Sequence, residues 1–468
     1  MPIRIYNSLG RKKEEFIPLN PGIVNIYTCG VTVYDESHIG HARSLYIFDL
    51  MRRYLQYRGF KVNFVRNITD IDDKIINRAN GLKINWKELV AQYIARYYED
   101  LEKLGIEKAD FEPRATENIP EMIKYIQVLI EKGFAYESGG DVYFEVRKFP
   151  AYGKLSGQSI DEMESGVRIE PSERKKDPLD FALWKASKPN EPWWDSPWGK
   201  GRPGWHIECS VMSQKFLKTD TLDIHAGGRD LIFPHHENEI AQAEALTGRT
   251  FARYWIHHGL LTINGQKMAK SQGNFVTIKD FMAKYKYADL LKLFFLSAHY
   301  AHPIDYTVEK IEEAKQALER ISILLNKIEE TTRLRGHQPA AKGIKEIEEL
   351  KGKFIAAMDD DFNTAEALAV VFELINLTNR HIADMDFVSQ AGQRLKELLA
   401  LFGLNLDFNK LRGADDDTRL IHDLVEKRIM LKKEKKFSEA DKIRAELEAM
   451  GIILEDAKDG NTTWRRRL

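Results

Sequence analysis

Apolar positions at the start of the chain form two short runs that are separated by one long periodic segment. Gly22–Cys29 and Lys61–Ile68 are short and rich in β-branched and aromatic residues, which is typical of strands. Between them, His41–Tyr57 places apolar residues at helical spacing and predicts a helix packed on a sheet. The order strand, helix, strand indicates a parallel α/β layer of the Rossmann type, an architecture that binds nucleotides.

The pattern changes after about Arg114 and returns near Thr221. Ile119–Gly133 has the spacing of an amphipathic helix, and Gly140–Lys154 has the composition of a hairpin. Lys175–Gly204 is rich in Pro, Trp and Lys with little periodicity, as expected of an inserted module or of a long loop. Strand, helix and strand patterns then resume over Thr221–His225, His235–Leu246 and Tyr254–Ile263. We interpret this as one sheet that an insertion interrupts.

Helical periodicity dominates the chain after Tyr306, over Val308–Arg333, Ile344–Met358 and Asn363–Asp384. Leu404–Asp417 predicts a linker. Two more helices follow, near Thr418–Lys435 and Ser438–Met450, the second with Ser438 as its N-cap. The predicted domains are the first half of the α/β domain at 1–115, an inserted connective module at 116–205, the second half at 206–305, a helical bundle at 306–410 and a small C-terminal domain at 411–468.

Composition restricts the class of protein. The 468 residues are 43% hydrophobic and 30% charged, which describes a folded protein of several domains and excludes a disordered one. The formal net charge is -1, so binding of nucleic acid would depend on a local basic surface. No apolar run approaches the roughly 20 residues of a membrane span, and Met1–Arg11 lacks a secretory signal. We therefore expect a cytoplasmic protein with no membrane partner, and two cysteines exclude a disulfide framework.

Two histidines stand where the first strand gives way to the first helix. His38 and His41 are one turn apart, with Gly40 between them. A helix N-terminus offers unpaired N–H groups and a partial positive charge, so it attracts anions such as a phosphate. Gly40 would let the backbone approach that ligand closely. The alternative is a pair of surface histidines that bind no ligand.

A second cationic segment lies far downstream, in Gly265–Asn274. Lys267 and Lys270 are three residues apart and glycines flank the segment, so it could close over a polyphosphate. Taken alone, it is equally consistent with an exposed hairpin whose lysines are solvated. Both segments occur in one chain, and the second follows the point where the α/β pattern resumes. Chance is therefore a poor explanation for the pair.

The two cysteines belong to a group of residues that can bind a metal ion. Cys29 ends the first strand, Cys209 lies downstream, and His235 and Glu239 are four residues apart on one face of a predicted helix. Two thiolates, an imidazole and a carboxylate are donors that zinc accepts. Their spacing differs from that of paired structural zinc motifs, so two buried thiols without a metal remain the alternative.

The two cationic segments resemble known motifs. His38–His41 (HIGH) and Lys267–Ser271 (KMAKS) are similar to the two signature motifs of the class I aminoacyl-tRNA synthetases. The resemblance implies roles in ATP binding and in adenylate formation, with Mg2+ bound to the ATP: His38, Gly40 and His41 at the phosphates, Lys267 and Lys270 at the transition state. Ala269 stands where the family usually has serine, which implies a tuned loop and retained activity.

A longer likeness leads to the cysteinyl-tRNA synthetases within that class. It runs essentially from end to end and includes Gly204–Cys209 (GWHIEC), Phe233–Glu239 (FPHHENE), Asp359–Thr364 and Trp464–Arg466. The resemblance implies one Zn2+ and an L-cysteine pocket: Cys29, Cys209, His235 and Glu239 for the metal, Thr32, Thr69, Trp205 and Asp230 for the amino acid. Zinc would distinguish the thiolate of cysteine from the hydroxyl of serine, because soft sulfur suits it better.

The end of the chain has chemistry suited to tRNA. The lysine-rich run Lys432–Lys436 and the terminal Arg465–Arg467 suit phosphate contacts, although a single lysine more often belongs to a solvated helix face. By resemblance, Phe437, Asp441 and Asp456 would read the anticodon of tRNA(Cys), which makes 411–468 an anticodon-binding domain. Phe437 stands where the family commonly has tryptophan, a larger stacking surface.

The implied function is ATP-dependent activation of cysteine and its transfer to tRNA(Cys) by a monomer. One alternative is a ligase that joins cysteine to an amino sugar in thiol biosynthesis, which would have no use for an anticodon module. Another is a non-catalytic tRNA-binding paralogue, which would need neither the histidine and lysine motifs nor the zinc residues.

Overall fold

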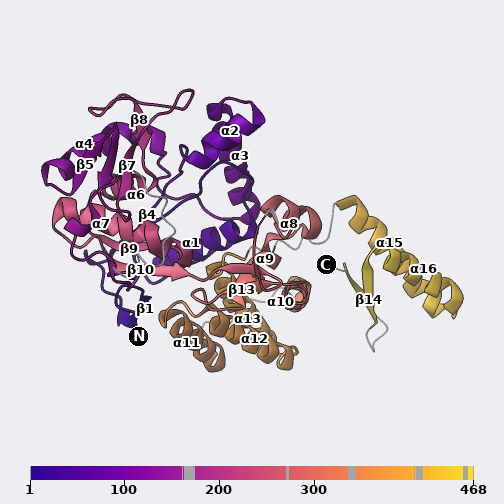
Figure 1. Ribbon diagram of the computed structural model, residues 1–468. Coiled ribbons are helices and arrows are strands. Elements are labelled where there is room, and N and C mark those ends of the chain that lie inside the picture. Colours follow the sequence, from indigo (N-terminus) through magenta and orange to yellow (C-terminus); the bar gives the residue numbers. More distant parts are fainter. Residues whose placement is uncertain are drawn as a thin grey trace.

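The computed structural model has at its centre a parallel sheet of four strands in the order β10-β9-β3-β4 (Figure 1). It describes residues 2–160, 162, 174–269, 273–335, 344–404, 406, 415–456 and 462–466. The strands of this sheet are β3 (Ile23–Thr28), β4 (Lys61–Arg66), β9 (Leu222–Gly228) and β10 (Ala252–His258). The helices beside it are α1 (Ile39–Tyr57), α2 (Asp73–Leu82), α3 (Trp86–Leu104), α6 (Trp205–Leu217) and α7 (Glu237–Thr247).

The sheet creates a ligand-binding position at the ends of its two inner strands. All of β9, and all of β3 after its first residue, is buried, as expected of parallel strands that are covered on both faces. β3 pairs with β4, which follows it in the chain, and with β9, which comes much later. Adjacent strands whose connections run in opposite directions leave a crevice at their carboxyl ends, where α/β proteins bind ligands. The predicted α/β fold class is therefore confirmed.

The inserted module contains its own antiparallel sheet in the order β5-β6-β7-β8. Its elements are α4 (Ile119–Glu131), β5 (Ala135–Ser138), β6 (Asp141–Phe144), β7 (Phe181–Ala186) and β8 (Gly201–Pro203). The hairpin turns at Gly139 and Gly140, whose φ values of 64° and 85° suit glycine, so the prediction that it spans Gly140–Lys154 was wrong. Lys175–Gly204 also contains two short strands where a loop was predicted.

Tyr254–Ile263, which was predicted to be one strand, contributes to two different sheets. After β10 the chain leaves the central sheet and enters a three-stranded one, β12-β11-β13. Arg43 Nη1 donates to the carbonyls of Gly259 (2.7 Å) and Leu260 (3.0 Å) and so fixes this break. The elements here are β11 (Leu261–Ile263), β12 (Gln266–Lys267), α8 (Ile278–Tyr285), α9 (Ala288–Leu296) and β13 (Ile304–Tyr306).

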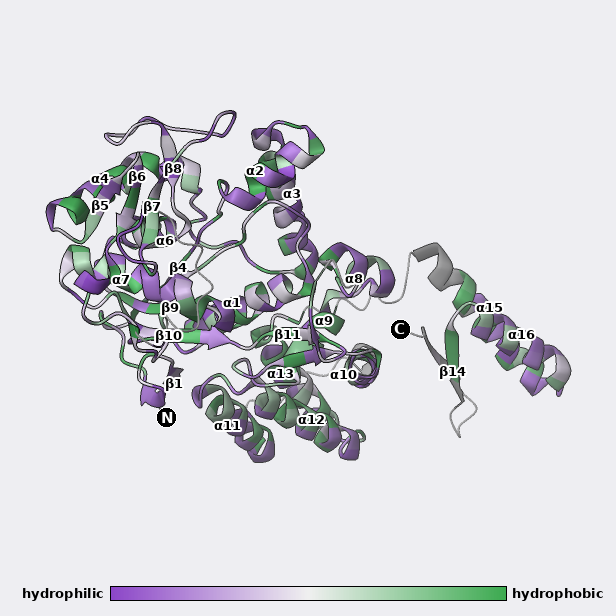
Figure 2. Ribbon diagram, viewed as in Figure 1, coloured by the Kyte–Doolittle hydropathy of each residue, from purple (hydrophilic) through white to green (hydrophobic). Residues whose placement is uncertain are grey.

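The helical bundle packs against the α1 side of the central sheet. It consists of α10 (Val308–Arg335), α11 (Lys345–Asp359), α12 (Thr364–Arg380) and α13 (Met385–Leu401), whose ribbons carry both hydrophobic and hydrophilic residues (Figure 2). One apolar core runs from α1 through α9 into the bundle, and a second lies among α6, α7 and the inserted strands. Among the described helices, none has the length and hydrophobicity of a bilayer-spanning segment.

The C-terminal module has a small core of its own, formed by Ile421, Val425, Ile443, Leu447 and Ile452. Its elements are α15 (Asp415–Lys433), α16 (Phe437–Ala449), β14 (Ile452–Asp456) and β15 (Thr462–Arg466). α16 begins one residue earlier than predicted, so Lys436 occupies the N-cap position and the assignment of Ser438 as the cap was wrong. A hairpin, β1 (Arg4–Asn7) and β2 (Lys12–Glu15), lies at the other end of the chain.

Candidate active site

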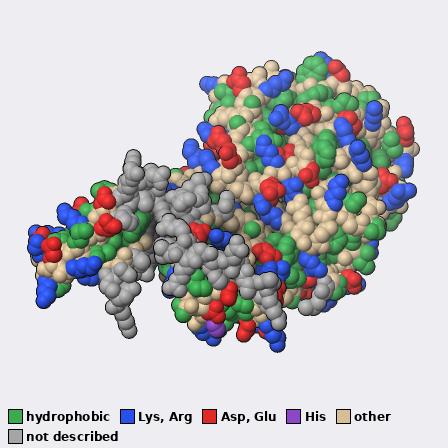
Figure 3. Space-filling model, turned by 180° about the vertical axis from the view of Figure 1, so that it is seen from behind, with side chains coloured by type: hydrophobic (Ala, Val, Ile, Leu, Met, Phe, Trp, Pro, Cys, Tyr) green, Lys and Arg blue, Asp and Glu red, His purple; other side chains and the backbone are tan. Residues whose placement is uncertain are grey.

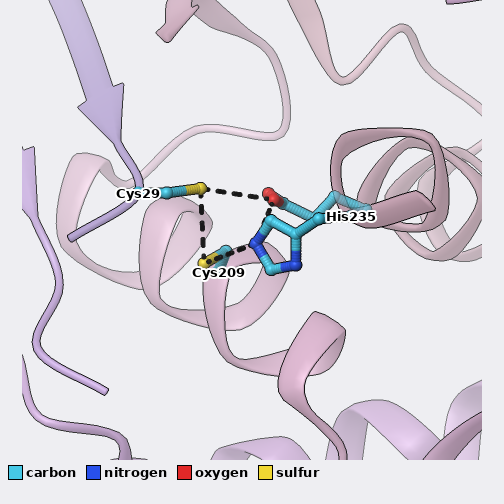
Figure 4. Close-up of side chains that lie close together, drawn as sticks. Cys29, Cys209 and His235 are labelled. Atoms are coloured by element: carbon cyan, nitrogen blue, oxygen red, sulfur yellow. Dashed lines mark hydrogen bonds and ion pairs between the residues drawn. The ribbon is translucent and has the colours of Figure 1, made fainter. Parts of the chain in front are cut away.

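The four predicted metal ligands meet at the carboxyl end of β3. Cys29 follows that strand directly, Cys209 comes from α6, and His235 and Glu239 come from the turn into α7 and from its first turn. Figure 4 shows the side chains of Cys29, Cys209 and His235 pointing toward one another. One ligand atom from each of the four residues lies within 4.8 Å of all the others, and Cys29 is the only member that is not fully buried.

Their spacing fits a tetrahedral ion. The sulfur atoms of Cys29 and Cys209 are 3.8 Å apart, and Cys209 Sγ lies 3.6 Å from His235 Nε2. Glu239 Oε1 lies 3.5 Å from Cys29 Sγ and 3.0 Å from His235 Nε2. Two sulfur ligands at about 2.3 Å from a tetrahedral zinc would lie about 3.8 Å from each other. The donor types and their separations therefore fit zinc.

Electrostatics in the cluster favour a cation. Burial and the neighbouring Cys209 raise the pKa of Cys29 well above its usual value. Burial also tends to raise the pKa of Cys209, but hydrogen bonding with Cys29 and the charge of His235 outweigh it and lower that pKa to about 6. Burial opposes charge on His235, yet Glu239 raises its pKa to about 10. The negative charges that hold a proton on His235 would equally attract a metal ion, which competes with protons for the same donors.

A second layer of histidines, which was not predicted, orients these ligands. His225 Nε2 lies 2.7 Å from Glu239 Oε2, the oxygen that turns away from the cluster. His206 Nδ1 lies 2.9 Å from His235 Nδ1, and His236 Nε2 lies 3.3 Å from Cys29 Sγ. Such outer contacts fix the direction and tautomer of a ligand. His225 and His236 also form an alternative donor set with Cys29 and Glu239.

The histidine pair forms the start of α1, close to this cluster along the sheet edge. His38 Nδ1 accepts from the backbone N–H of His41 (3.2 Å), and His41 Nδ1 accepts from that of His38 (3.4 Å). The rings stack with centroids 3.7 Å apart. A neutral imidazole whose Nδ1 accepts carries its proton on Nε2, so both rings present an N–H donor outward. A Cβ at Gly40 would come within 2.9 Å of the His38 ring, so this position has no room for a larger residue.

The predicted lysine loop approaches the same helix N-terminus. Lys267 is exposed at the end of β12, and Lys270 lies outside the described residues. Asn274 closes the loop, because its side chain donates to Lys267 O (3.1 Å) and accepts from the backbone N–H of Ala269 (2.8 Å). Farther on, Ile39 N–H donates to Val276 O at 3.0 Å. The described part of the lysine segment therefore lies beside the start of α1.

The predicted cysteine-pocket residues differ in how they relate to the cluster. Thr32 and Thr69 form a parallel bridge, and the Thr69 hydroxyl donates to Glu208 Oε2 at 2.8 Å. Trp205 stacks on the His235 ring with centroids 4.0 Å apart. Asp230 is exposed just beyond β9, where its charge acts on His258. A small cavity is lined by Thr32, His38 and His41 together.

Sequence comparisons bear on the whole chain. Residues 15–316 match the family described as tRNA synthetases class I (C) catalytic domain, and residues 353–407 match the DALR domain. A curated protein of Aquifex aeolicus named cysteine–tRNA ligase is 49% identical and is covered to 99%, with 100% of this chain aligned. One of Thermodesulfovibrio yellowstonii with the same name is 50% identical, with both chains fully covered. This chain belongs to the cysteine–tRNA ligase family.

Solved structures support the class I fold of this family member. Mycobacterium tuberculosis methionyl-tRNA synthetase in complex with methionyl-adenylate is 15% identical and aligns with a TM-score of 0.63 over 85% of this chain and 95% of its own. A leucyl enzyme of Agrobacterium radiobacter in a ternary complex (LeuRS-tRNA-LeuAMS) is 11% identical, with a TM-score of 0.62 over 83% and 85%. At these identities the likeness establishes the fold alone.

The tRNA residues predicted for this cysteine–tRNA ligase family member lie in the C-terminal module. Phe437 begins α16 and is 58% exposed, and Asp441 is exposed one turn later on the same face. Asp456 ends β14, and its side chain lies outside the described part of the structure. Lys and Arg side chains are interspersed with Asp and Glu over this lobe and the main body (Figure 3). On that face, positive and negative side chains of the described residues are therefore mixed, and among them no continuous basic surface marks a binding site for nucleic acid.

Proposed function

We propose that the protein activates L-cysteine with ATP and transfers the cysteinyl group to tRNA(Cys). The observation that carries this proposal is the buried cluster of two thiols, an imidazole and a carboxylate, which adjoins a phosphate-binding helix N-terminus. Identity of 49% and 50% to relatives named cysteine–tRNA ligase, over the full chain, supports the same reaction.

Selection of cysteine would occur at the cluster. Cys29, Cys209, His235 and Glu239 would hold Zn2+, and His225 would keep Glu239 oriented. Zinc, when bound there, supplies a soft Lewis acid that prefers a thiolate to a hydroxyl. Trp205 closes one side of the pocket by stacking on His235. Because the site is buried and its ligands are held from two directions, the sulfur position is fixed before the substrate arrives.

Adenylate formation would occur where the pocket meets α1. The Nε2–H groups of His38 and His41, together with the helix N-terminus, would donate to ATP phosphates. The cysteine carboxylate would attack the α-phosphorus of the Mg2+-bound ATP, which forms cysteinyl-adenylate and expels pyrophosphate. Lys267 and Lys270 would neutralise the charge that develops on the phosphates in this step. Asp230 would accept from the substrate ammonium, and Thr32 and Thr69 would fix its position. In this scheme both motifs act on the phosphates of the same ATP.

Transfer to tRNA would use the rest of the chain. The terminal ribose hydroxyl of the tRNA would attack the adenylate carbonyl and release AMP. The inserted module would receive the acceptor end, and Phe437, Asp441 and Asp456 would contact the anticodon through stacking and through hydrogen bonds from base N–H groups. We expect the protein to act as a monomer in the cytoplasm.

Charging of total tRNA tests this function directly. Full-length protein with zinc, ATP, Mg2+ and labelled cysteine should transfer acid-stable label to one tRNA species. Cysteine-dependent pyrophosphate exchange without charging would contradict the tRNA step and favour the ligase that joins cysteine to an amino sugar. If the protein shows neither pyrophosphate exchange nor tRNA charging with zinc present, the proposed catalysis is contradicted. A non-catalytic tRNA-binding protein would then be the remaining interpretation.

A further inference from the structure

The turn between α11 and α12 holds the helical bundle to the catalytic domain through two buried carboxylates, those of Asp359 and Asp361. It includes Asp359–Asn363, part of a segment that takes no role in the proposed chemistry of cysteine or ATP. Figure 1 shows the end of α11 near the N-terminal strand β1, where Arg4 and Asp360 form a bridge. Each aspartate contacts a different element of the catalytic domain, so the turn connects the bundle to several parts of the active-site framework.

Asp359 holds the end of α1 that is distant from the active site. Its carboxylate is 3% exposed and accepts a hydrogen bond of 2.6 Å from the Tyr54 hydroxyl. The same oxygen pairs with the Arg58 guanidinium. Tyr54 lies in the last turns of α1, and the first residues of that helix form the phosphate site. Asp359 therefore fixes the bundle to the end of α1 that lies away from the proposed phosphate site.

Asp361 connects two further segments. Its carboxylate is 2% exposed, and one oxygen accepts both from the backbone N–H of Tyr6 (2.8 Å) and from the hydroxyl of Tyr300 (2.7 Å). Its own N–H donates to Arg4 O at 2.8 Å. Ser8, which directly follows β1, donates its backbone N–H to Trp255 O of β10 at 2.9 Å, so the β1 segment is attached to the central sheet. Asp361 therefore joins the bundle to the central sheet.

The backbone of this turn is in an unusual conformation. Asp361 and Phe362 are consecutive and have φ values of 66° and 50°, in the left-handed region that side chains other than glycine's rarely adopt. Phe362 is fully buried. Such a conformation persists where surrounding contacts determine it, and it concentrates where geometry matters for function. The apolar core shared by α1 and the bundle is non-directional, whereas these polar contacts fix one angle between the two parts.

We propose that Asp359 and Asp361 are positioning residues for the transfer step. They fix the bundle relative to α1 and the central sheet, so that a tRNA held by the helical parts presents its terminal ribose to the adenylate. This inference rests on the proposed function, because it assigns the two aspartates to the tRNA-dependent step. It also predicts that activation of cysteine, which needs no tRNA, is independent of them.

Three full-length variants test the proposal. Asp361→Gly removes the side-chain contacts and suits the left-handed backbone, so the turn itself is retained. Tyr54→Phe removes a hydrogen bond to Asp359 with little change of volume. Asp360→Asn is the matched control, because the Asp360 side chain is 48% exposed and pairs only at the surface with Lys13, at 2.8 Å. Thermal unfolding checks that each variant is folded at the assay temperature.

Two rates are compared in each variant. Cysteine-dependent pyrophosphate exchange without tRNA should stay within about twofold of wild type, whereas kcat for tRNA charging should fall about 10- to 100-fold in Asp361→Gly and less in Tyr54→Phe. The Asp360→Asn control should keep both rates within about twofold. The proposal is overturned if both test variants charge tRNA at the control rate, or if exchange falls in the same proportion as charging. A wild-type protein that exchanges but charges no tRNA would overturn the proposed function, and this inference with it.

Discussion

The buried cluster of Cys29, Cys209, His235 and Glu239 and the lysine loop, to which we assign roles in one reaction, are built in opposite ways. Three of the four cluster residues are fully buried, and the ligands come from different elements of the fold. Lys267 is exposed on a strand of two residues, and its loop is closed by hydrogen bonds of Asn274. Selecting sulfur over oxygen requires a fixed pocket, whereas a polyphosphate must enter and leave. The difference predicts that damage to the cluster affects both fold and activity, and damage to the loop affects activity alone.

Replacing Cys209 with alanine should have the largest effect. The change removes a metal ligand and leaves the buried His235–Glu239 pair with a missing partner, so bound zinc should be lost and the unfolding temperature should fall. We expect cysteine-dependent pyrophosphate exchange to fall about 10³-fold or more. Metal content by mass spectrometry and thermal unfolding measure the other two effects.

Ser213→Ala is the control for this variant, since Ser213 is buried one turn farther along α6 and bonds only to its own helix, at Ser210 O. It should retain its zinc and its activity. Full exchange activity in Cys209→Ala would contradict a ligand role for that thiol.

Lys267→Ala should reduce activity and leave stability unchanged. Loss of one cation that stabilises developing phosphate charge typically costs about 10²- to 10³-fold in rate. Lys267 is exposed, so the free energy of unfolding should change by less than about 0.5 kcal/mol. Exchange kinetics and denaturant unfolding test the two halves. The control is Lys279→Ala, because Lys279 is exposed in the first turn of α8, and it should leave both quantities at wild-type values. Equal losses of activity in the two variants would contradict a specific role for Lys267.

His225→Asn should have an intermediate effect. Loss of the contact between His225 and Glu239 should lower zinc affinity about 10- to 100-fold, because outer contacts orient a ligand without binding the metal. Exchange activity should therefore fall at limiting zinc and recover in excess zinc. His381→Asn changes an exposed histidine of the bundle and should shift neither curve. Activity that excess zinc does not restore would assign His225 a role beyond orientation.

Asp100→Asn should have the smallest effect and should alter stability alone. Burial raises the pKa of Asp100 to about 6, while Lys103 opposes this rise. A folded-state pKa above the unfolded value of 3.8 means that the folded protein binds the proton more tightly, so the carboxylate destabilises the fold above about pH 6. The variant should gain about 1–2 kcal/mol at pH 8, after allowance for solvent screening, and nothing below about pH 4. A gain that does not depend on pH would contradict this cause.

Sequence reasoning reached the parts of the site that are encoded locally. The strand, the helix and the histidine pair between them are contiguous, so their pattern predicts both structure and an anion site. The four metal ligands could be named by resemblance to a family, but their meeting point could not be derived, because it depends on strands far apart in sequence pairing with β3. His206, His225 and His236 were missed because the role of each arises only from the residues that the fold places beside it. The FPHHENE segment, with two adjacent histidines, carried the only signal.

Other errors came from short elements. β7 lies in a stretch rich in Pro, Trp and Lys, and its apolar residues Phe181, Leu183 and Trp184 were too few to outweigh that composition. The strand over Tyr254–Ile263 was predicted as one because both parts are apolar, but Arg43 binds the carbonyls between them and the second part joins another sheet. Ser438 lost the cap position because α16 starts directly after Lys436, following a left-handed Lys435.

The central claim, that the buried cluster selects cysteine through a metal ion, is tested most directly by substrate preference with and without zinc. Pyrophosphate exchange would be measured for cysteine and serine on zinc-loaded protein and on protein stripped by a chelator, with its fold verified by circular dichroism. The account predicts that the loaded protein prefers cysteine in kcat/KM by at least about 10⁴-fold, and that stripping brings the cysteine value down toward that of serine. A stripped protein that keeps both its activity and its preference for cysteine would contradict the account.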